Sequence, residues 1–383
     1  MSQIKVLQFI SPSGFYGAER WVLAFANNID PQRMRCDLAV TRESPNQDLR
    51  VADFHPDSAG QVHYVDMAGR FDIRSVKTLV NIIREREIDV ILTHGYKSDI
   101  LGLIAGRISG IRCVSTPHGF SGNVGFKLKM FIRLGTSILR YFDAVAPLSE
   151  ELIEDMHRFR VPSSKIRFIR NGVDIKDIDA TLANPGSREK SLAGIRPIGF
   201  IGQLIPRKGL LDLLSAFEGL HEHHQGLELQ LIGEGRQRPQ LEEKCTLMKA
   251  GRAVRFLGFR EDRLELLSKF EMFVMTSSLE GIPRCLMESM AVGVPVVAYD
   301  IPGVDQLIED GVTGLLVPHG DVGALVNACN KLLNDPELKA TLTANARTRV
   351  EEVYSARRMA DEYLELFQQL MSSPNSTVTG GAD

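Results

Sequence analysis

The feature that most constrains this chain is a regular alternation of short β-branched runs with amphipathic helical stretches, repeated in two series. Such alternation is typical of parallel sheets whose faces are covered by helices. The predicted strands of the first series are Ile4–Phe9, Asp89–Thr93, Arg112–Thr116, Asp143–Pro147 and Lys165–Ile169. Those of the second are Pro197–Gly202, Leu227–Ile232, Val254–Leu257, Met272–Met275, Val294–Ala298 and Gly314–Val317. The sequence therefore predicts two α/β domains.

The length of 383 residues supports this division, because one hydrophobic core rarely organises so long a chain. We place the first domain at residues 1–172 and the second at residues 173–354. A last amphipathic helix, residues 355–370, is predicted to pack back on the first domain. Residues 371–383 are rich in Ser, Thr and Gly, and we expect them to form a disordered tail.

The composition excludes several classes of protein. No apolar stretch approaches the roughly 18 residues that span a bilayer, and the first residues lack a basic region, so we expect a cytoplasmic protein. The five cysteines are scattered, which suits a reducing compartment. A net charge of −3 argues against nucleic-acid binding. The cluster His221–His224 lacks the spacing of a helical zinc site and no Asp-x-Asp element follows a strand, so we expect no metal.

One interval is strongly basic. No acidic residue occurs between Asp99 and Asp143. Within it, Phe126–Arg140 read as a helix separates an apolar face from a basic one. One interpretation is an interfacial helix that rests on an anionic membrane, at the inner face of the cell membrane, to reach a lipid-linked acceptor. The other is that the apolar face packs on the sheet while the basic face is solvated.

Three strand ends could hold a phosphate, since helix N-termini beyond parallel strands offer unpaired N–H groups. Gly14 and Gly17 follow the first strand and could let the backbone approach a diphosphate. Gly233 opens a Gly-x-Gly element, but the third glycine of a dinucleotide fingerprint is replaced and no acidic residue ends the next strand. A dehydrogenase is therefore a poor candidate. Arg207 and Lys208 place two cations at another strand end, where they could pair with a pyrophosphate.

The stretch SSLEGIPRCLMESMAVGVPVV is the most informative. Glu280 lies in the loop after a predicted strand, and Glu288 lies early in the helix that follows. Carboxylates suit hydroxyl-rich ligands because their oxygens accept hydrogen bonds, so the two could hold a sugar and a ribose. The backbone between them would line a diphosphate; it comprises Gly281, Ile282, Pro283, Arg284, Cys285 and Leu286.

Taken together, these motifs resemble family 4 of the retaining GT-B glycosyltransferases, and the resemblance extends over nearly the whole chain. The matching segments are GFYGAER from Gly14, TPHGF from Thr116, RNGVD from Arg170, GQLIPRKG from Gly202, IGEG from Ile232, FLGF from Phe256, EGIPRCLME from Glu280 and DGVTGLLVPHGD from Asp310. The resemblance implies two Rossmann-like domains that face each other across a cleft.

The resemblance also implies roles for individual residues. Glu280 would contact hydroxyls of the donor sugar, Glu288 the ribose, and Lys208 the diphosphate. Phe259 and Arg260 would border the base, and His118 matches the family histidine near the transferred sugar. The implied reaction is transfer with retention, in which the leaving phosphate helps to deprotonate the acceptor. One departure is Gln203, where the family usually has an arginine; Arg207 is the candidate that compensates for it.

The expected function is transfer of a hexosyl group from a UDP- or GDP-linked sugar to a glycan or lipid-linked hydroxyl, in polysaccharide, lipopolysaccharide or glycolipid assembly. The nucleotide sugar is a co-substrate, and no other cofactor is expected. Two alternatives stay open. One is a nucleotide-sugar epimerase of the same architecture, and the other is a subunit that binds nucleotide sugar without turnover, which Gln203 would explain.

Overall fold

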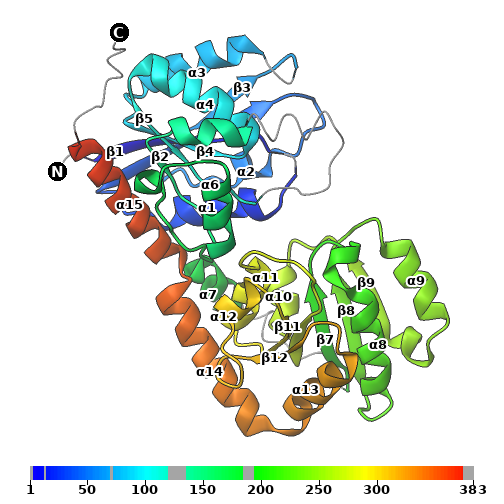
Figure 1. Cartoon of the computed structure of the whole chain (residues 1–383). Coiled ribbons are helices and arrows are strands. Elements are labelled where there is room, and N and C mark those ends of the chain that lie inside the picture. Colours follow the sequence, from blue (N-terminus) through cyan, green and yellow to red (C-terminus); the bar gives the residue numbers. More distant parts are fainter. Residues whose placement is uncertain (1–2, 13, 70–71, 120–134, 184–193, 374–383) are drawn as a thin grey trace. The chain divides into compact units, whose positions relative to one another are not determined.

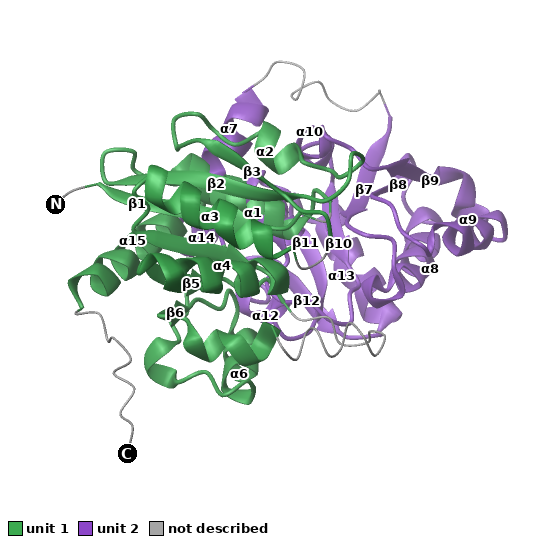
Figure 2. Ribbon diagram, turned by 90° about the horizontal axis from the view of Figure 1, so that it is seen from above, with its two compact units in different colours: residues 1–171, 356–383 green, residues 172–355 purple. Residues whose placement is uncertain are grey.

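The computed structural model describes residues 3–12, 14–69, 72–119, 135–183 and 194–373. The chain forms two compact units (Figure 2). Unit 1 comprises residues 1–171 together with 356–383, and unit 2 comprises residues 172–355. Each unit is built on one six-stranded sheet. In both sheets the strands pair in parallel.

Unit 1 has the strand order β3-β2-β1-β4-β5-β6. Its strands are β1 (Ile4–Ile10), β2 (Met34–Arg42), β3 (Val62–Asp66), β4 (Val90–His94), β5 (Arg112–Ser115) and β6 (Ala144–Val145). Its helices include α1 (Gly17–Asn28), α2 (Arg50–Asp53), α3 (Ile73–Glu85), α4 (Tyr96–Ser109), α6 (Glu150–Arg158) and α15 (Ala356–Ser372). Helix α15 thus ends at Ser372, beyond the predicted end at residue 370, and residues 374–383 of the predicted tail lie outside the described residues.

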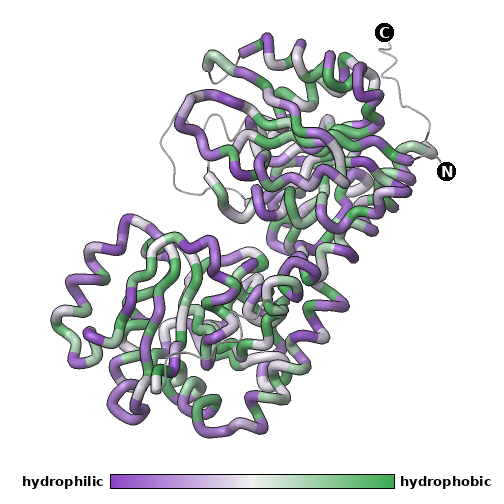
Figure 3. Tube along the Cα trace, turned by 180° about the vertical axis from the view of Figure 1, so that it is seen from behind, coloured by the Kyte–Doolittle hydropathy of each residue, from purple (hydrophilic) through white to green (hydrophobic). Residues whose placement is uncertain are grey.

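The first strand shows how the sequence pattern builds two apolar layers. Successive side chains of a strand point to opposite faces. Val6 and Ile10 of β1 pack with α1 and α15, whereas Leu7 and Phe9 pack with α3 and α4. The helices accordingly cover both faces of the sheet (Figure 1). In both units the strands are mainly hydrophobic, whereas hydrophobic and hydrophilic residues alternate along the surrounding helices (Figure 3).

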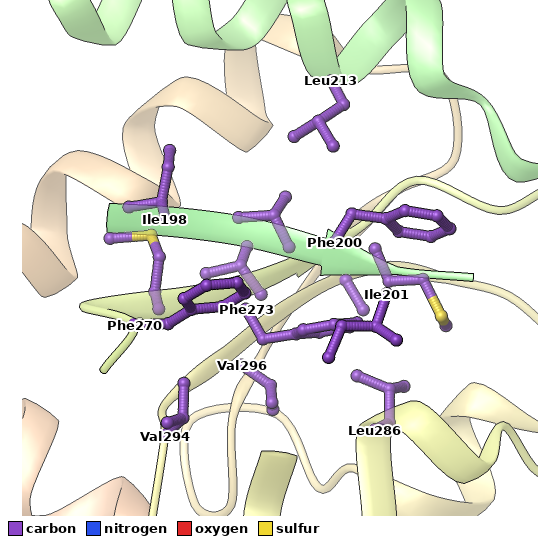
Figure 4. Close-up of a cluster of buried hydrophobic side chains, with 14 of the residues drawn as sticks. Ile198, Phe200, Ile201, Leu213, Phe270, Phe273, Leu286, Val294 and Val296 are labelled. Carbon is purple, nitrogen blue, oxygen red and sulfur yellow. The ribbon is translucent and has the colours of Figure 1, made fainter. Parts of the chain in front are cut away.

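Unit 2 has the strand order β12-β11-β10-β7-β8-β9. Its strands are β7 (Arg196–Ile201), β8 (Leu227–Ile232), β9 (Val254–Gly258), β10 (Met272–Met275), β11 (Val296–Asp300) and β12 (Leu315–Pro318). Its helices are α7 (Ile175–Ala183), α8 (Leu210–His221), α9 (Arg238–Thr246), α10 (Arg263–Leu267), α11 (Arg284–Ala291), α12 (Val304–Leu307), α13 (Val322–Asn334) and α14 (Pro336–Val353). Leu213 of α8 and Leu286 of α11 pack on opposite faces of β7 and its neighbours (Figure 4).

Two parts of the predicted strand pattern are wrong. Strands β2 and β3 were not predicted, because charged residues interrupt their apolar pattern: Asp37 in the middle of β2 is completely buried. The predicted strand Lys165–Ile169 is not a strand. It is joined to β6 and the residues after it by one isolated bridge between Ile166 and Val145 and by the N–H groups of Arg167 and Ile169, which donate to the carbonyls of Val145 and Pro147. Neighbouring β6 is two residues long and ends before Pro147, which has no N–H to extend the ladder.

Both sheets have the Rossmann strand order, in which the direction of winding reverses between two neighbouring strands. That switch lies between β1 and β4 in unit 1, and between β7 and β10 in unit 2. Ligands of open α/β sheets bind beyond the carboxyl ends of the strands at this point. A binding site is therefore expected among the residues that follow β1, β4, β7 and β10.

The predicted interfacial helix Phe126–Arg140 falls mainly on residues 120–134, which lie outside the described residues. At its described end, Leu139 is buried and Arg140 is exposed. Within the described ranges, no helix combines the length and apolarity that crossing a bilayer requires. Membrane contact remains a prediction, for which salt-sensitive flotation with anionic vesicles is the test.

Candidate functional site

The exits of β7 and β10 are held together at the switch point of unit 2. The hydroxyl of Thr276 donates to the carbonyl of Lys208 at 3.0 Å, and the N–H of Ser278 donates to the carbonyl of Arg207 at 2.8 Å. Gly209 has a φ of +63°, and a Cβ there would lie 1.9 Å from the carbonyl oxygen of Thr276. Only glycine lets the two loops approach this closely. The backbone therefore fixes where Arg207 and Lys208 lie.

Glu280 forms an ion pair with the two cations of this loop. Lys208 Nζ donates to Glu280 Oε1, and both side chains are less than a tenth exposed. Arg207 Nη1 lies 3.5 Å from Glu280 Oε2 and donates to the carbonyl of Leu279 at 2.8 Å, while its side chain is 45% exposed. Lys208 keeps further N–H donors. The structure therefore brings Glu280, Lys208 and Arg207 together, with one cation in excess over the carboxylate.

Glu288 is held by two arginines. It is the fifth residue of α11, and its side chain is 4% exposed. Arg263 Nη2 of α10 and Arg284 Nε both donate to Glu288 Oε1, at 2.8 and 2.9 Å. Asp177 of α7 interacts electrostatically with the same two arginines. Burial and then Asp174 raise the pKa of Asp177, while Arg263 and Arg284 lower it. Glu288 is thus a buried hydrogen-bond acceptor in the middle of α11, held by two guanidinium groups.

The backbone between the two glutamates agrees only partly with the prediction. Pro283 precedes α11 and has no N–H. Leu286 donates its N–H to the carbonyl of Pro283 at 3.1 Å and its side chain is fully buried, and its place along a diphosphate stays a prediction. Gly281 is exposed, Ile282 is buried, and burial raises the pKa of the Cys285 thiol to about 12. Arg284 acts through its guanidinium, which the sequence prediction did not consider.

The ends of β8 and β9 carry the remaining predicted residues of unit 2. The N–H of Gly233 donates to Gly258 at 2.7 Å, and a Cβ on Gly233 would lie 1.9 Å from the carbonyl oxygen of Gly202. The N–H of Gly233 is therefore already used in a hydrogen bond, and the glycine is required by the close approach of the Gly202 backbone. Phe259 is 44% exposed, and Arg260 pairs with Asp262 through two hydrogen bonds of 2.7 and 2.5 Å.

At the switch point of unit 1, α1 begins at the predicted glycine loop. Gly17 is the first residue of α1 and is exposed, with open space around it. Gly14 is buried, and a Cβ there would lie 2.2 Å from the Tyr16 ring. Glu19 accepts from the N–H of Tyr16 at 3.0 Å and so caps the helix start. An exposed helix N-terminus with a glycine at its first position can accept an anion.

His118 lies beside a second histidine that the sequence prediction missed. Nδ1 of His94, the last residue of β4, is 3.0 Å from Nε2 of His118. The Trp21 ring of α1 contacts both imidazoles, with centroid distances of 5.0 and 5.6 Å. Burial lowers the pKa of His118 to about 4, and burial followed by the neighbouring imidazole lowers the pKa of His94. Both rings are neutral at physiological pH.

A buried carboxyl group supports these strand ends. Asp99 of α4 accepts from the hydroxyls of Thr93 at 2.6 Å and Ser115 at 2.9 Å. Burial raises the pKa of Asp99 to about 7, and the two hydroxyl hydrogen bonds oppose that rise. Tyr363 of α15 hydrogen-bonds Thr116 at 2.7 Å. The segment that carries His118 is therefore tied to β4, α4 and α15.

Within the described residues, no group of three or more His, Cys, Asp or Glu side chains could hold a metal ion. His221, Glu222 and His224 are used elsewhere: His224 contacts Asn330 at 2.7 Å, and Glu222 pairs with Lys249.

The chain is similar to known glycosyltransferases over most of its length. Residues 192–349 match the family model of glycosyl transferases group 1, and residues 15–177 match that of glycosyltransferase family 4. The UDP-Gal:α-D-GlcNAc-diphosphoundecaprenol α-1,3-galactosyltransferase of Escherichia coli is 26% identical over 310 residues, which are 77% of this chain and 79% of that protein.

Solved structures share the fold. The Anabaena protein HepE in complex with UDP superposes with a TM-score of 0.77 at 21% identity, covering 96% of this chain and 100% of that one. A glycosyltransferase of Rickettsia africae superposes with a TM-score of 0.81 at 17% identity, covering 97% and 100%. The strand order of both sheets, the two family models and the E. coli relative lead to the same conclusion. This chain belongs to the group 1, family 4 glycosyltransferases of GT-B fold, which are transferases of glycan or glycolipid synthesis.

Proposed function

We propose that this glycosyltransferase moves a hexosyl group, with retention, from a UDP-linked donor to a hydroxyl of a lipid-linked or polysaccharide acceptor. The observation that carries the proposal is the convergence of Glu280 and Lys208 at the switch point of unit 2, next to α11 with Glu288. The E. coli relative is named for UDP-Gal and a diphosphoundecaprenol-linked acceptor, and HepE was solved with UDP, which supports uracil as the base.

In this proposal each charged group has a ligand of matching chemistry. Glu280 accepts from sugar hydroxyls and Glu288 from the ribose, while Lys208 and Arg207 balance the diphosphate together with the N-terminal end of α11. Phe259 and Arg260 border the base, and Gly14 and Gly17 carry the backbone that approaches phosphate in unit 1. His118 contacts the transferred sugar.

The proposed reaction needs no protein nucleophile. The acceptor oxygen forms a bond to the anomeric carbon on the face from which UDP departs. The bond between that carbon and the β-phosphate oxygen breaks with both electrons on the oxygen, and the leaving phosphate takes the acceptor's proton. The protein contributes by holding the diphosphate in a fixed field of cations and dipoles.

Thermal denaturation with a panel of donors tests the binding half of the proposal. A ligand that binds only the native state at 100 times its Kd stabilises it by about 2.7 kcal/mol. We expect UDP-glucose or UDP-galactose to raise the Tm, and GDP-mannose and ADP-glucose to raise it less. Glu288→Gln should lose most of the shift, whereas Glu243→Gln, an exposed glutamate of α9, should keep it. A panel in which no nucleotide-diphosphate sugar raises the Tm contradicts the proposal.

Turnover separates the alternatives. Release of UDP with transfer, or with slow hydrolysis when no acceptor is present, supports the transferase, and an α-configured product from an α-linked donor supports retention. Formation of an epimeric UDP-sugar would instead identify an epimerase. Binding without any chemistry would identify a non-catalytic subunit.

A further inference from the structure

The histidine pair of unit 1 requires a particular arrangement of protons. A hydrogen bond between His94 Nδ1 and His118 Nε2, which are 3.0 Å apart, needs a proton on one nitrogen and a lone pair on the other. The ring planes are inclined by 47°, and Trp21 packs against both. Two neutral imidazoles satisfy this requirement in either of two ways, which differ in the nitrogen that donates.

The surroundings of His94 decide between them. His94 is 4% exposed, and its Nε2 is buried with no hydrogen-bond partner among the residues that the structure describes. A proton on Nε2 would leave a buried donor unsatisfied, which costs about 1–3 kcal/mol, and buried orphan N–H groups are rarer than under-satisfied acceptors. The ring proton of His94 therefore belongs on Nδ1, which donates to His118 Nε2.

This arrangement determines what His118 can do. Its Nε2 lone pair is occupied, so its own single proton is on Nδ1. His118 is partly exposed, whereas His94 is buried. We propose that His94 is a positioning residue for sugar transfer: it fills the Nε2 lone pair of His118, so that His118 presents Nδ1–H as a donor and does not act as a general base. This inference rests on the proposed role of His118.

The groups packed around the pair leave this assignment in place. Thr93 and Ser115, the neighbours of the pair on β4 and β5, direct their hydroxyls to Asp99, and Thr116 hydrogen-bonds Tyr363. The hydrogen bonds of the adjacent strand ends are thus made to other partners. A donor at His118 also agrees with a reaction in which the leaving phosphate, rather than a side chain, takes the proton.

The first test is spectroscopic and needs no ligand. Two-bond ¹H–¹⁵N spectra of the full-length, histidine-labelled protein report which ring nitrogen carries the proton, and His94→Asn and His118→Asn identify the signals. We expect His118 to be protonated at Nδ1 and unprotonated at Nε2. The opposite tautomer at His118 would overturn the inference, whatever the enzyme's activity.

The second test is kinetic, with UDP release from UDP-glucose and UDP-galactose as the readout. His94→Leu should lower kcat by about 10-fold or more with little change in donor KM, because His118 is then no longer fixed as a donor through Nδ1 in the transition state. His94→Asn retains an N–H near the Nδ1 position and should recover most of kcat. His55→Leu, at another buried histidine of unit 1, controls for packing damage and should leave kcat unchanged.

His94→Leu with full kcat, or His94→Asn no better than a correctly folded His94→Leu, would refute the positioning role. His118→Ala distinguishes this failure from that of the proposed function. If His118→Ala transfers sugar at the full rate, the proposed role of His118 is wrong even where the tautomer is as expected.

Discussion

The two units share one strand order, but the side chains at their switch points differ in charge. At the switch point of unit 1 the strand ends hold two neutral imidazoles packed on Trp21. At that of unit 2 they hold the ion pair of Lys208 and Glu280, and α11 adds Glu288 between two arginines. A shared topology thus provides the same place beyond the strand ends, and the residues that follow each strand decide its chemistry.

The difference has a physical consequence for stability. A buried neutral imidazole needs few partners, but the native state loses stability when the ring must be protonated. A buried ion pair tolerates pH changes around neutrality, but removing one member leaves an uncompensated charge. Unit 1 should therefore respond mainly to acid, and unit 2 mainly to the loss of a charged partner.

The largest expected effect is in unit 2. Lys208→Met should lower the free energy of unfolding by about 3 kcal/mol, because breaking a buried pair costs on the order of 3–5 kcal/mol and Arg207 compensates in part. Hydrogen exchange of peptides from β10 and α11 would measure it. The double variant Lys208→Met with Glu280→Gln should recover stability but not donor binding. If Lys208→Met left the hydrogen-exchange protection of these peptides unchanged, unit 2 would not depend on its charged partners as stated.

The acid response of unit 1 comes next in size. His55 is 6% exposed, and burial lowers its pKa to about 4, although Asp37 and Asp57 favour the proton. Because the folded pKa lies below the unfolded value of about 6.5, the stabilisation is complete above pH 6.5 and is lost as the pH falls towards 4. Acidification from pH 7 to pH 5 should therefore lower the free energy of unfolding of unit 1 by about 2 kcal/mol through His55.

The single tryptophan, Trp21, lies in unit 1, so its fluorescence in urea reports this unit alone. His55→Phe should reduce the dependence on pH, with His94 and His118 still contributing to it, whereas His157→Phe, at an exposed position of α6, should leave it unchanged. If wild type and His55→Phe lose stability equally on acidification, the histidine explanation for unit 1 is wrong.

The smallest effect concerns the exposed cation of unit 2. Arg207→Ala should weaken binding of UDP-glucose about 5-fold, or about 1 kcal/mol, since its side chain is 45% exposed and solvent screens it. Isothermal titration measures the Kd. Adding Gln203→Arg, at the exposed position where the family usually has arginine, should restore affinity. An unchanged Kd for Arg207→Ala would mean that Arg207 does not compensate for Gln203.

Much of the fold could be predicted because the spacing of hydrophobic residues and the residues that end a strand can be recognised within a short stretch of sequence. Strands β8 and β10 coincide with their predicted ranges, and the other strands of unit 2 shift by one or two residues. Strand β2 could not be found in this way. Its central Asp37 is stabilised by Arg86 at 2.7 Å, by the N–H of Gln61 at 3.0 Å and by His63. Those partners come from distant segments, so the pattern alone reads Asp37 as an exposed loop residue.

The site shows the same limit. Glu280 and Lys208 were expected together, and the structure pairs them; the pairing of Glu288 with Arg284 follows from helical spacing of four residues. Arg263 and His94 were missed because each reaches the site from a separate element, and only the folded backbone brings them within hydrogen-bond distance. The sequence could not show which N–H groups before α11 are already used, because the exact start of the helix decides that: Leu286 donates its N–H to Pro283.

Helix α15 belongs to unit 1 but follows unit 2 in the sequence, so the core of unit 1 can be completed only after unit 2 has been synthesised. Tyr363 and Phe367 close the apolar layer against Trp21 and Phe25 of α1, yet they follow residues 172–355 in the chain and leave the ribosome after them. Residues 172–355 can finish their own core before that. The unit that is synthesised first is therefore the one completed last, and during translation the α1 surface waits uncovered while the inserted unit folds.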